Sequence, residues 1–266
     1  MMRFIIFFIS CLYFSQNKTF IYELDYKPNS LKDSIVNETF FLDIQNNQSI
    51  FRSPIEKKSD SLVMRTGMGY GRGPNLEAQR YVVKDLKSNS IYKSIITRLR
   101  DYYSINIDEK LDWQILPEKD KIASMNIQKA QVTYGGRKWV AWFTNEIPIP
   151  EGPYIFHGLP GLIVSISDDK KEYIFKLVKS KNSGNELFMR PKGTEMSYPA
   201  FQKLMKDYFN DPFSELKIRN LNMMKDDGNG NPVKANYNEE TKRIRKLILK
   251  NNNPIELNYK NDYKVN

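Results

Sequence analysis

The sequence predicts a β-rich α+β domain: a large, curved antiparallel sheet built from hairpins, with one or two C-terminal helices packed on it. Three observations favour this class. Apolar and polar residues alternate through much of the chain, as they do along half-buried strands. The 16 Tyr and 15 Phe are residue types that pack well on a pleated sheet. Helical spacing of apolar residues is clearest in the last third of the chain.

The first 15 residues are predicted to be a secretory signal peptide. A short basic start precedes the apolar run FIIFFISCLYF, residues 4–14. This run is too short to span a bilayer, which takes roughly 20 residues. Cleavage would leave a single domain, residues 16–266, with no transmembrane segment. We therefore expect an exported protein of the periplasm, outer membrane or cell surface; the alternative is a lipoprotein anchored at Cys11.

The domain opens with predicted strands at residues 20–26 and 36–44, and a third begins at Ile50. Together they indicate an antiparallel meander. The glycine-rich stretch RTGMGYGRGPN follows, and its spacing fits neither a dinucleotide-binding nor a P-loop motif. We interpret it as a loop; the alternative is a contact role for Tyr70 and Arg72.

Two alternating runs, residues 130–134 and 139–143, flank Gly135 and Gly136. Because both glycines tolerate a positive φ, this pattern predicts a tight β-hairpin. The segment EIPIPEGPY that follows has three prolines, which exclude a continuous central strand.

Residues 159–162, Leu-Pro-Gly-Leu, predict a type II turn in which Gly161 supplies the positive φ. A phosphate-binding loop would need several converging backbone N–H groups, and Pro160 has none. The turn leads into a predicted strand, residues 162–167, which forms a second hairpin with residues 172–179.

The last third of the chain predicts a helix over residues 197–209, with Ser197 as its cap and Pro199 in its first turn. A second, basic helix is predicted over residues 239–250. The final apolar segment, residues 254–259, is predicted to be a strand.

Composition limits the chemistry. His157 is the single histidine and Cys11 the single cysteine, so cysteine/histidine zinc sites are excluded and no metal or cofactor is expected. The net charge of +10 favours an anionic partner. For an exported protein that partner is envelope material such as lipid headgroups rather than nucleic acid, which leaves peripheral membrane association open. The alternative is a solvated basic surface.

The block GRKWVAWFTNEIPIPEGPYIFHGLPGLIVSISD, residues 136–168, resembles the signature block of the GLPGLI family, exported proteins of the Bacteroidota. The family takes its name from the hexapeptide found here as Gly158, Leu159, Pro160, Gly161, Leu162 and Ile163. FIYELDY and NNNPIELNYK, near the two ends, also fit its pattern. The resemblance implies export, no assigned biochemical function and no catalytic residues. Ile127 departs from the pattern, because many members carry a cysteine there.

Four residues are candidates for ligand binding: Arg137, Trp139, Trp142 and His157. The arginine and the tryptophans could form a cation–π or stacking patch. The two tryptophans should face opposite sides of their strand, so at most one joins the core. His157 could act as a general base, or it could be a packed, half-buried residue.

Three functions are compatible with these observations. The first is a non-enzymatic envelope protein that binds an apolar or anionic ligand, or a partner protein, in the concavity of the sheet. The second is an accessory subunit of an outer-membrane assembly. The third is a hydrolase that uses a carboxylate pair among Glu146, Glu151, Asp168 and Asp169.

Overall fold

The computed structural model describes residues 17–70, 73–88, 90–184 and 186–264. The predicted signal peptide, Cys11 and Arg72 lie outside these residues. Among the helices of the described part, none is both long and apolar enough to cross a bilayer.

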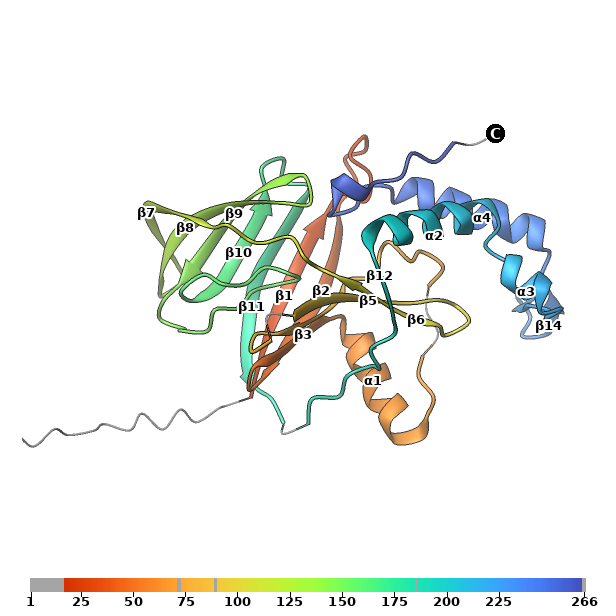
Figure 1. The fold of residues 1–266 in the computed structure, drawn as a ribbon, viewed down its shortest axis with the longest axis horizontal. Coiled ribbons are helices and arrows are strands. Elements are labelled where there is room, and N and C mark those ends of the chain that lie inside the picture. The colour runs from red at the N-terminus through yellow and green to blue at the C-terminus, as the bar shows by residue number, and fades with distance from the viewer. Residues whose placement is uncertain (1–16, 71–72, 89, 185, 265–266) are drawn as a thin grey trace, which may run out of the picture.

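Twelve strands of the described chain form one sheet, in the order β12-β6-β5-β4-β3-β2-β1-β11-β10-β9-β8-β7 (Figure 1). This confirms the predicted β-rich α+β class. The strands are β1 (Lys18–Tyr26), β2 (Val36–Gln45), β3 (Gln48–Arg52), β4 (Tyr81–Asp85), β5 (Ser90–Ile96), β6 (Tyr102–Asn106), β7 (Gln114–Ile122), β8 (Met125–Tyr134), β9 (Arg137–Thr144), β10 (Leu162–Asp168), β11 (Tyr173–Asn182) and β12 (Thr194–Met196). A separate small hairpin pairs β13 (Met224–Asp226) with β14 (Pro232–Lys234).

The sheet consists of two antiparallel meanders, β1 to β6 and β7 to β11, joined where β1 pairs with β11. One edge is the short strand β12, which runs parallel to β6. The other edge is β7, whose pairing with β8 shifts register between Ile115 and Lys119, on either side of Pro117. In Figure 1 the sheet curves, with β7 to β11 on one side and the helices α2 and α4 beside the other half.

The predicted alternation is confirmed along β1 and along the β8–β9 hairpin. The alternating apolar residues of these strands are buried in one core cluster: Phe20, Tyr22, Leu24, Tyr26, Ala130, Val132, Tyr134, Trp139, Ala141 and Phe143. Gly135 and Gly136 have φ of 61° and 77°, as the predicted tight turn requires. The second predicted hairpin is also present, as β10 and β11.

Lys84 of β4 holds the loop between β9 and β10 in place. The ammonium of Lys84 forms an ion pair with Glu151, and both side chains are fully buried. It also donates to the carbonyl oxygens of Gly152, at 2.9 Å, and Phe156, at 3.3 Å. Ser49 donates to the same carboxylate at 2.6 Å. Burial lowers the pKa of Lys84, and the charge of Glu151 opposes that effect.

The type II turn predicted at residues 159–162 is wrong. Gly161 has no positive φ; the positive value, 90°, belongs to Gly158. The amide of Gly161 donates to the carbonyl oxygen of Leu159 at 2.7 Å, which closes a three-residue turn around Pro160. Glycine is required at 161 because a Cβ there would lie 2.0 Å from the carbonyl oxygen of Thr144. The constraint is close backbone packing rather than the dihedral angle.

Two helices were predicted and are confirmed, α2 (Tyr198–Asn210) and α4 (Tyr237–Lys250). The hydroxyl of Ser197 caps α2 by accepting from the amide of Ala200. The buried residues of α2 recur at helical spacing: Phe201, Met205 and Phe209. A short helix, α3 (Ser214–Ile218), lies between α2 and α4.

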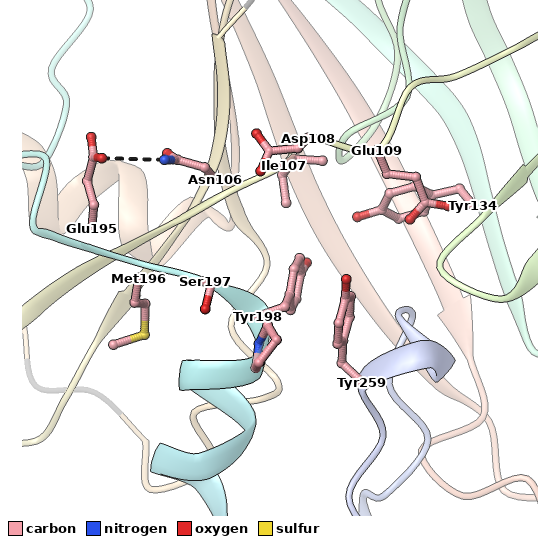
Figure 2. A pocket seen from close by; sticks show the side chains of 11 residues that line it. Asn106, Ile107, Asp108, Glu109, Tyr134, Glu195, Met196, Ser197, Tyr198 and Tyr259 are labelled. Carbon is pink, nitrogen blue, oxygen red and sulfur yellow. Dashed lines mark hydrogen bonds between the residues drawn. The ribbon is translucent and has the colours of Figure 1, made fainter.

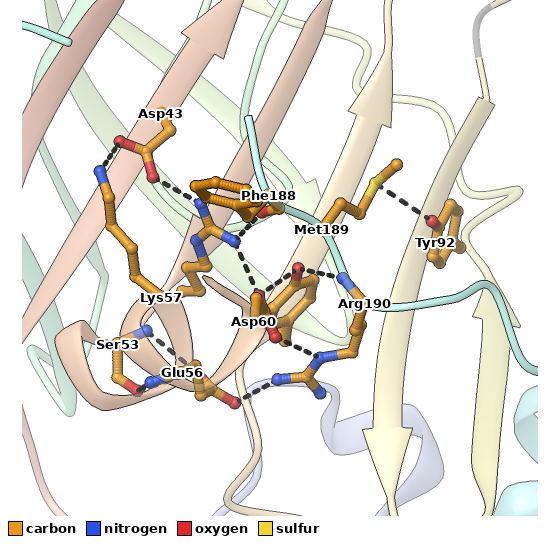
Figure 3. A network of polar contacts seen from close by, with 11 residues as sticks. Asp43, Ser53, Glu56, Lys57, Asp60, Tyr92, Phe188, Met189 and Arg190 are labelled. Atoms are coloured by element: carbon orange, nitrogen blue, oxygen red, sulfur yellow. Dashed lines mark hydrogen bonds and ion pairs between the residues drawn. The ribbon is translucent and has the colours of Figure 1, made fainter. Parts of the chain in front are cut away.

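Helix α1 (Pro54–Thr66) was not predicted, because the face that it buries is polar. Glu56, Ser59 and Asp60 point into the protein. The carboxylate of Asp60 forms an ion pair with the guanidinium of Arg52 at 2.7 Å. The carboxylate of Glu56 forms an ion pair with Arg190 at 3.0 Å (Figure 3). A search for apolar periodicity does not find a helix held by ion pairs.

The strand predicted over residues 254–259 is wrong. This segment is a loop that ends in the 3-10 helix η1 (Leu257–Tyr259). The guanidinium of Arg137 donates to the carbonyl oxygens of Pro254, at 2.9 Å, and Ile255, at 3.1 Å. These carbonyl groups therefore bind a side chain instead of a neighbouring strand.

We expect Gly161→Ala to lower the free energy of unfolding by at least the roughly 1–3 kcal/mol that overpacking costs, because the new methyl group collides with the backbone of Thr144. Urea denaturation measures the change. Gly73→Ala is the matched control, since a Cβ at Gly73 meets nothing within 4 Å. Equal stability of both variants would contradict this reason for the glycine.

We expect Lys84→Met to cost about 3–5 kcal/mol of unfolding free energy, because the carboxylate of Glu151 then stays buried without its cation. The double variant Lys84→Met/Glu151→Gln should recover part of this loss, since no charge remains. Both are compared by urea denaturation. A double variant no more stable than the single one would show that the charge is not what matters.

Candidate functional site

The candidate pocket is a cavity of about 400 Å³ that opens beside the start of α2 (Figure 2). Its walls come from four parts of the chain: the end of β6 with the loop after it, β12 with the first turn of α2, the end of β8, and η1. The lining residues are Asn106, Ile107, Asp108, Glu109, Tyr134, Glu195, Met196, Ser197, Tyr198, Pro199 and Tyr259.

The lining is acidic in a chain that is basic overall. It contains the carboxylates of Asp108, Glu109 and Glu195, and no Lys, Arg or His is among the described residues that form it. Glu109 accepts a hydrogen bond from the amide of Gly135 at 3.1 Å. Hydrogen bonding and charge from Lys192, which lies outside the lining, lower the pKa of Glu195. Glu195 is thus paired with a cation, and Asp108 and Glu109 supply the negative charge that attracts cations, although the net charge of the chain is +10.

Tyrosines form the other wall. The rings of Tyr198 and Tyr259 stack with centroids 4.3 Å apart and planes 2° apart. Figure 2 shows their hydroxyl ends pointing toward the cavity. Burial, and then the charge of Glu256, raise the pKa of Tyr198 well above its usual value. Its hydroxyl therefore stays protonated; the oxygen itself is buried and has no hydrogen-bond partner among the described residues.

Behind this wall lies Glu256, a buried carboxylate that holds Tyr134 of the lining and Tyr154 of the core. It accepts from the hydroxyl of Tyr134 at 3.1 Å and from that of Tyr154 at 2.6 Å. The ammonium of Lys93 lies 3.7 Å from its other oxygen. This role could not be predicted from the sequence, because the pattern of residues 254–259 predicts a strand.

Two of the four predicted binding residues, Arg137 and Trp139, are buried. Arg137 donates to Asp168 at 2.8 Å and to the side chain of Asn253 at 2.7 Å. The indole N–H of Trp139 donates to the carbonyl oxygen of Tyr134 at 3.1 Å. Both side chains thus have partners inside the core.

The other two candidates, Trp142 and His157, are half-buried. The indole of Trp113 donates to the carbonyl oxygen of His157 at 2.8 Å, and Nδ1 of His157 lies 2.9 Å from the carbonyl oxygen of Ile155. Since a carbonyl oxygen only accepts, Nδ1 carries the proton. None of the four predicted residues lines the candidate pocket. Ligand binding at Trp142 or His157 stays a prediction.

The four predicted carboxylates do not line the candidate pocket either. Glu151 and Asp168 are held in buried ion pairs, with Lys84 and Arg137. Glu146 and Asp169 are exposed, and Glu146 accepts from the amide of Asn126 at 2.8 Å.

Across the described ranges, no group of three or more His, Cys, Asp and Glu side chains is arranged to hold a metal ion.

The fold defines the chain as a β-rich α+β protein. Comparison with known proteins shows that part of the chain matches the model of an uncharacterised family. A family model described as "Protein of unknown function (Porph_ging)" matches residues 90–165. This match overlaps the block that resembles the GLPGLI family; membership of that family stays a prediction. No curated protein matches the chain.

Two solved structures of PNGF-II resemble the fold. The structure in space group C2 has a TM-score of 0.51 at 12% sequence identity, and the match covers 71% of this chain and 32% of that one. The structure in space group P21 has a TM-score of 0.49, again at 12% identity, over 71% of this chain and 33% of that one. The chain thus spans about a third of PNGF-II, and the first of these matches shows a shared fold alone.

We expect stability to fall as the pH drops below about 6.5, the ordinary pKa of histidine. Burial, and then the charge of Lys84, lower the pKa of His157. Between the folded and unfolded pKa values the unfolded chain binds more protons, so acid favours unfolding. Urea denaturation at pH 7.5 and pH 5.5 measures the effect.

The matched variant is His157→Gln, which removes the only histidine. Its stability should change less over the same pH interval. The attribution to His157 fails if the variant and the wild type lose equal stability.

Proposed function

We propose that this chain is an exported, non-enzymatic protein of the cell envelope that binds a cationic group in the candidate pocket. The group is an ammonium or guanidinium, carried by a partner protein or by a small ligand. One observation carries the proposal: the carboxylates of Asp108 and Glu109, which form no ion pair with other described residues, line the cavity together with three tyrosines. The third carboxylate of the lining, Glu195, is paired with Lys192.

The size and chemistry of the cavity support this assignment. A volume of about 400 Å³ lies within the range of small-ligand sites and exceeds the needs of a single amino-acid side chain. The carboxylates can accept the hydrogen bonds that an ammonium donates. The net charge favoured an anionic ligand, but the acidic lining repels one, so an anionic partner has to meet another surface.

Binding is favoured over catalysis by the state of the polar groups. The tyrosines around Glu256 stay protonated, because burial raises the pKa of Tyr134 and Tyr198. Glu256 itself is buried and hydrogen-bonded to tyrosine hydroxyls behind the wall. Asp108 and Glu109 are exposed, as suits charges that attract a ligand.

The test is an NMR titration with N-acetyl-lysine amide as the probe. We expect saturable shifts at the amides around Asp108, Glu109 and Tyr198. N-acetyl-norleucine amide has the same stem without the ammonium and should cause none of them. Equal shifts with both probes would overturn the proposal.

Asp108→Asn and Glu109→Gln should each weaken binding of the lysine probe by roughly two- to fivefold, the usual contribution of an exposed ion pair. The control is Glu118→Gln on β7, an exposed carboxylate outside the pocket that is paired with Lys129. It should bind the probe as the wild type does. A loss in the control as large as in the pocket variants would mean that only overall charge matters.

A further inference from the structure

The loop between β1 and β2, residues 27–35, presents two apolar side chains to solvent. Leu31 is 92% exposed, the highest value among the large apolar residues of the described chain, and Ile35 is 65% exposed. The loop is nevertheless ordered by its own hydrogen bonds. The side-chain oxygen of Asn29 accepts from the amide of Leu31 at 3.0 Å, and its backbone carbonyl oxygen accepts from the amide of Lys32 at 3.1 Å. Leu31 is thus held outward by a turn.

Exposed lysines surround this loop. The amide of Lys27 donates to the carbonyl oxygen of Glu172 at 2.8 Å, which places the β10–β11 turn, with Lys170 and Lys171, beside it. On the other side of the loop, the side-chain amide of Asn29 donates to the backbone carbonyl oxygen of Leu249 at 3.3 Å. This contact places the end of α4, with the exposed Lys250, next to the loop (Figure 1).

The acidic groups nearby do not cancel this charge. Asp33 is paired with Lys27 at 3.2 Å, and Glu172 is paired with Arg137 at 2.8 Å. Lys32, Lys170, Lys171 and Lys250 are exposed, and Asp169 is the one exposed carboxylate of the β10–β11 turn. The surface therefore combines an apolar tip with a positive rim.

We propose that this loop docks the protein on an anionic lipid membrane, with Leu31 and Ile35 inserted between headgroups and the lysine rim on the lipid charges. Peripheral proteins bind such surfaces by the same combination of buried apolar area and attraction to anionic lipid. The rim argues against a second copy of the chain as the occupant, since a twofold contact would bring like charges together.

Ile218 on α3 shows what distinguishes this tip. It is 84% exposed, nearly as much as Leu31. However, its neighbour Lys217 is paired with Asp211 at 2.7 Å, and Arg219 forms an ion pair with Glu215. An exposed apolar residue among neutralised charges has no preference for an anionic surface, so Ile218 provides a matched control.

The test is co-sedimentation with vesicles of phosphatidylcholine, either pure or containing a quarter of phosphatidylglycerol. The protein is purified from cells expressing the full-length chain, so every variant carries the same amino terminus. We expect binding to the anionic vesicles that weakens as salt is raised. Leu31→Asp/Ile35→Asp should weaken it by roughly tenfold or more, because insertion is lost. Lys170→Glu/Lys171→Glu should weaken it at least as much, at roughly fivefold for each lysine.

Two controls separate the loop from overall charge and apolarity. Ile218→Asp should bind like the wild type. Lys119→Glu/Lys121→Glu should also bind like the wild type. These exposed lysines lie on β7 beside the start of β8, whereas Gly135 follows the other end of β8. Equal binding to neutral and anionic vesicles would overturn the proposal, and so would an equal loss in the controls. A dimer that Leu31→Asp dissociates, without any vesicle binding, would identify a second copy as the true occupant.

Discussion

The buried ion pair between Lys84 and Glu151 is the interaction on which the rest of the structure depends. It joins a strand of the first meander to the loop that leads into β10, so it ties together segments far apart in the sequence. An unpaired charge at this depth would cost several kcal/mol, so arrangements of the loop that separate the pair are disfavoured. The same loop carries Tyr154 and Phe156, which are buried in the core, and the hydroxyl of Tyr154 donates to Glu256.

Arginines fix the other irregular segments in the same manner. Arg137 holds the chain near Pro254 against the β8–β9 hairpin, while Arg52 and Arg190 hold helix α1 (Figure 3). The strands supply apolar area, and buried cations position the connections between them. The candidate pocket depends on both kinds of interaction. Its Tyr134 comes from a strand, and its Tyr259 comes from a segment that Arg137 orients.

The hairpins and two of the helices could be predicted because their signals are local: alternation, paired glycines and a capped apolar face. Helix α1 could not, since its buried face is polar and its partner Arg190 is distant in the sequence. The sequence predicts ligand binding by Arg137, but the structure pairs it with Asp168 and Asn253 in the core. These partners are far from it in the sequence, so no local pattern reveals them. The pocket combines residues from four parts of the chain that are far apart in the sequence, so no local pattern marks it.

The two edges of the sheet differ from its interior in what they offer to another chain. Strand β12 provides only three residues, and Pro117 in β7 lacks the N–H that a regular ladder would use, at the point where the register shifts. A neighbouring molecule that tried to extend the sheet would find no long, flat template. The protein can therefore keep a twelve-stranded sheet without promoting strand-by-strand growth into fibrils.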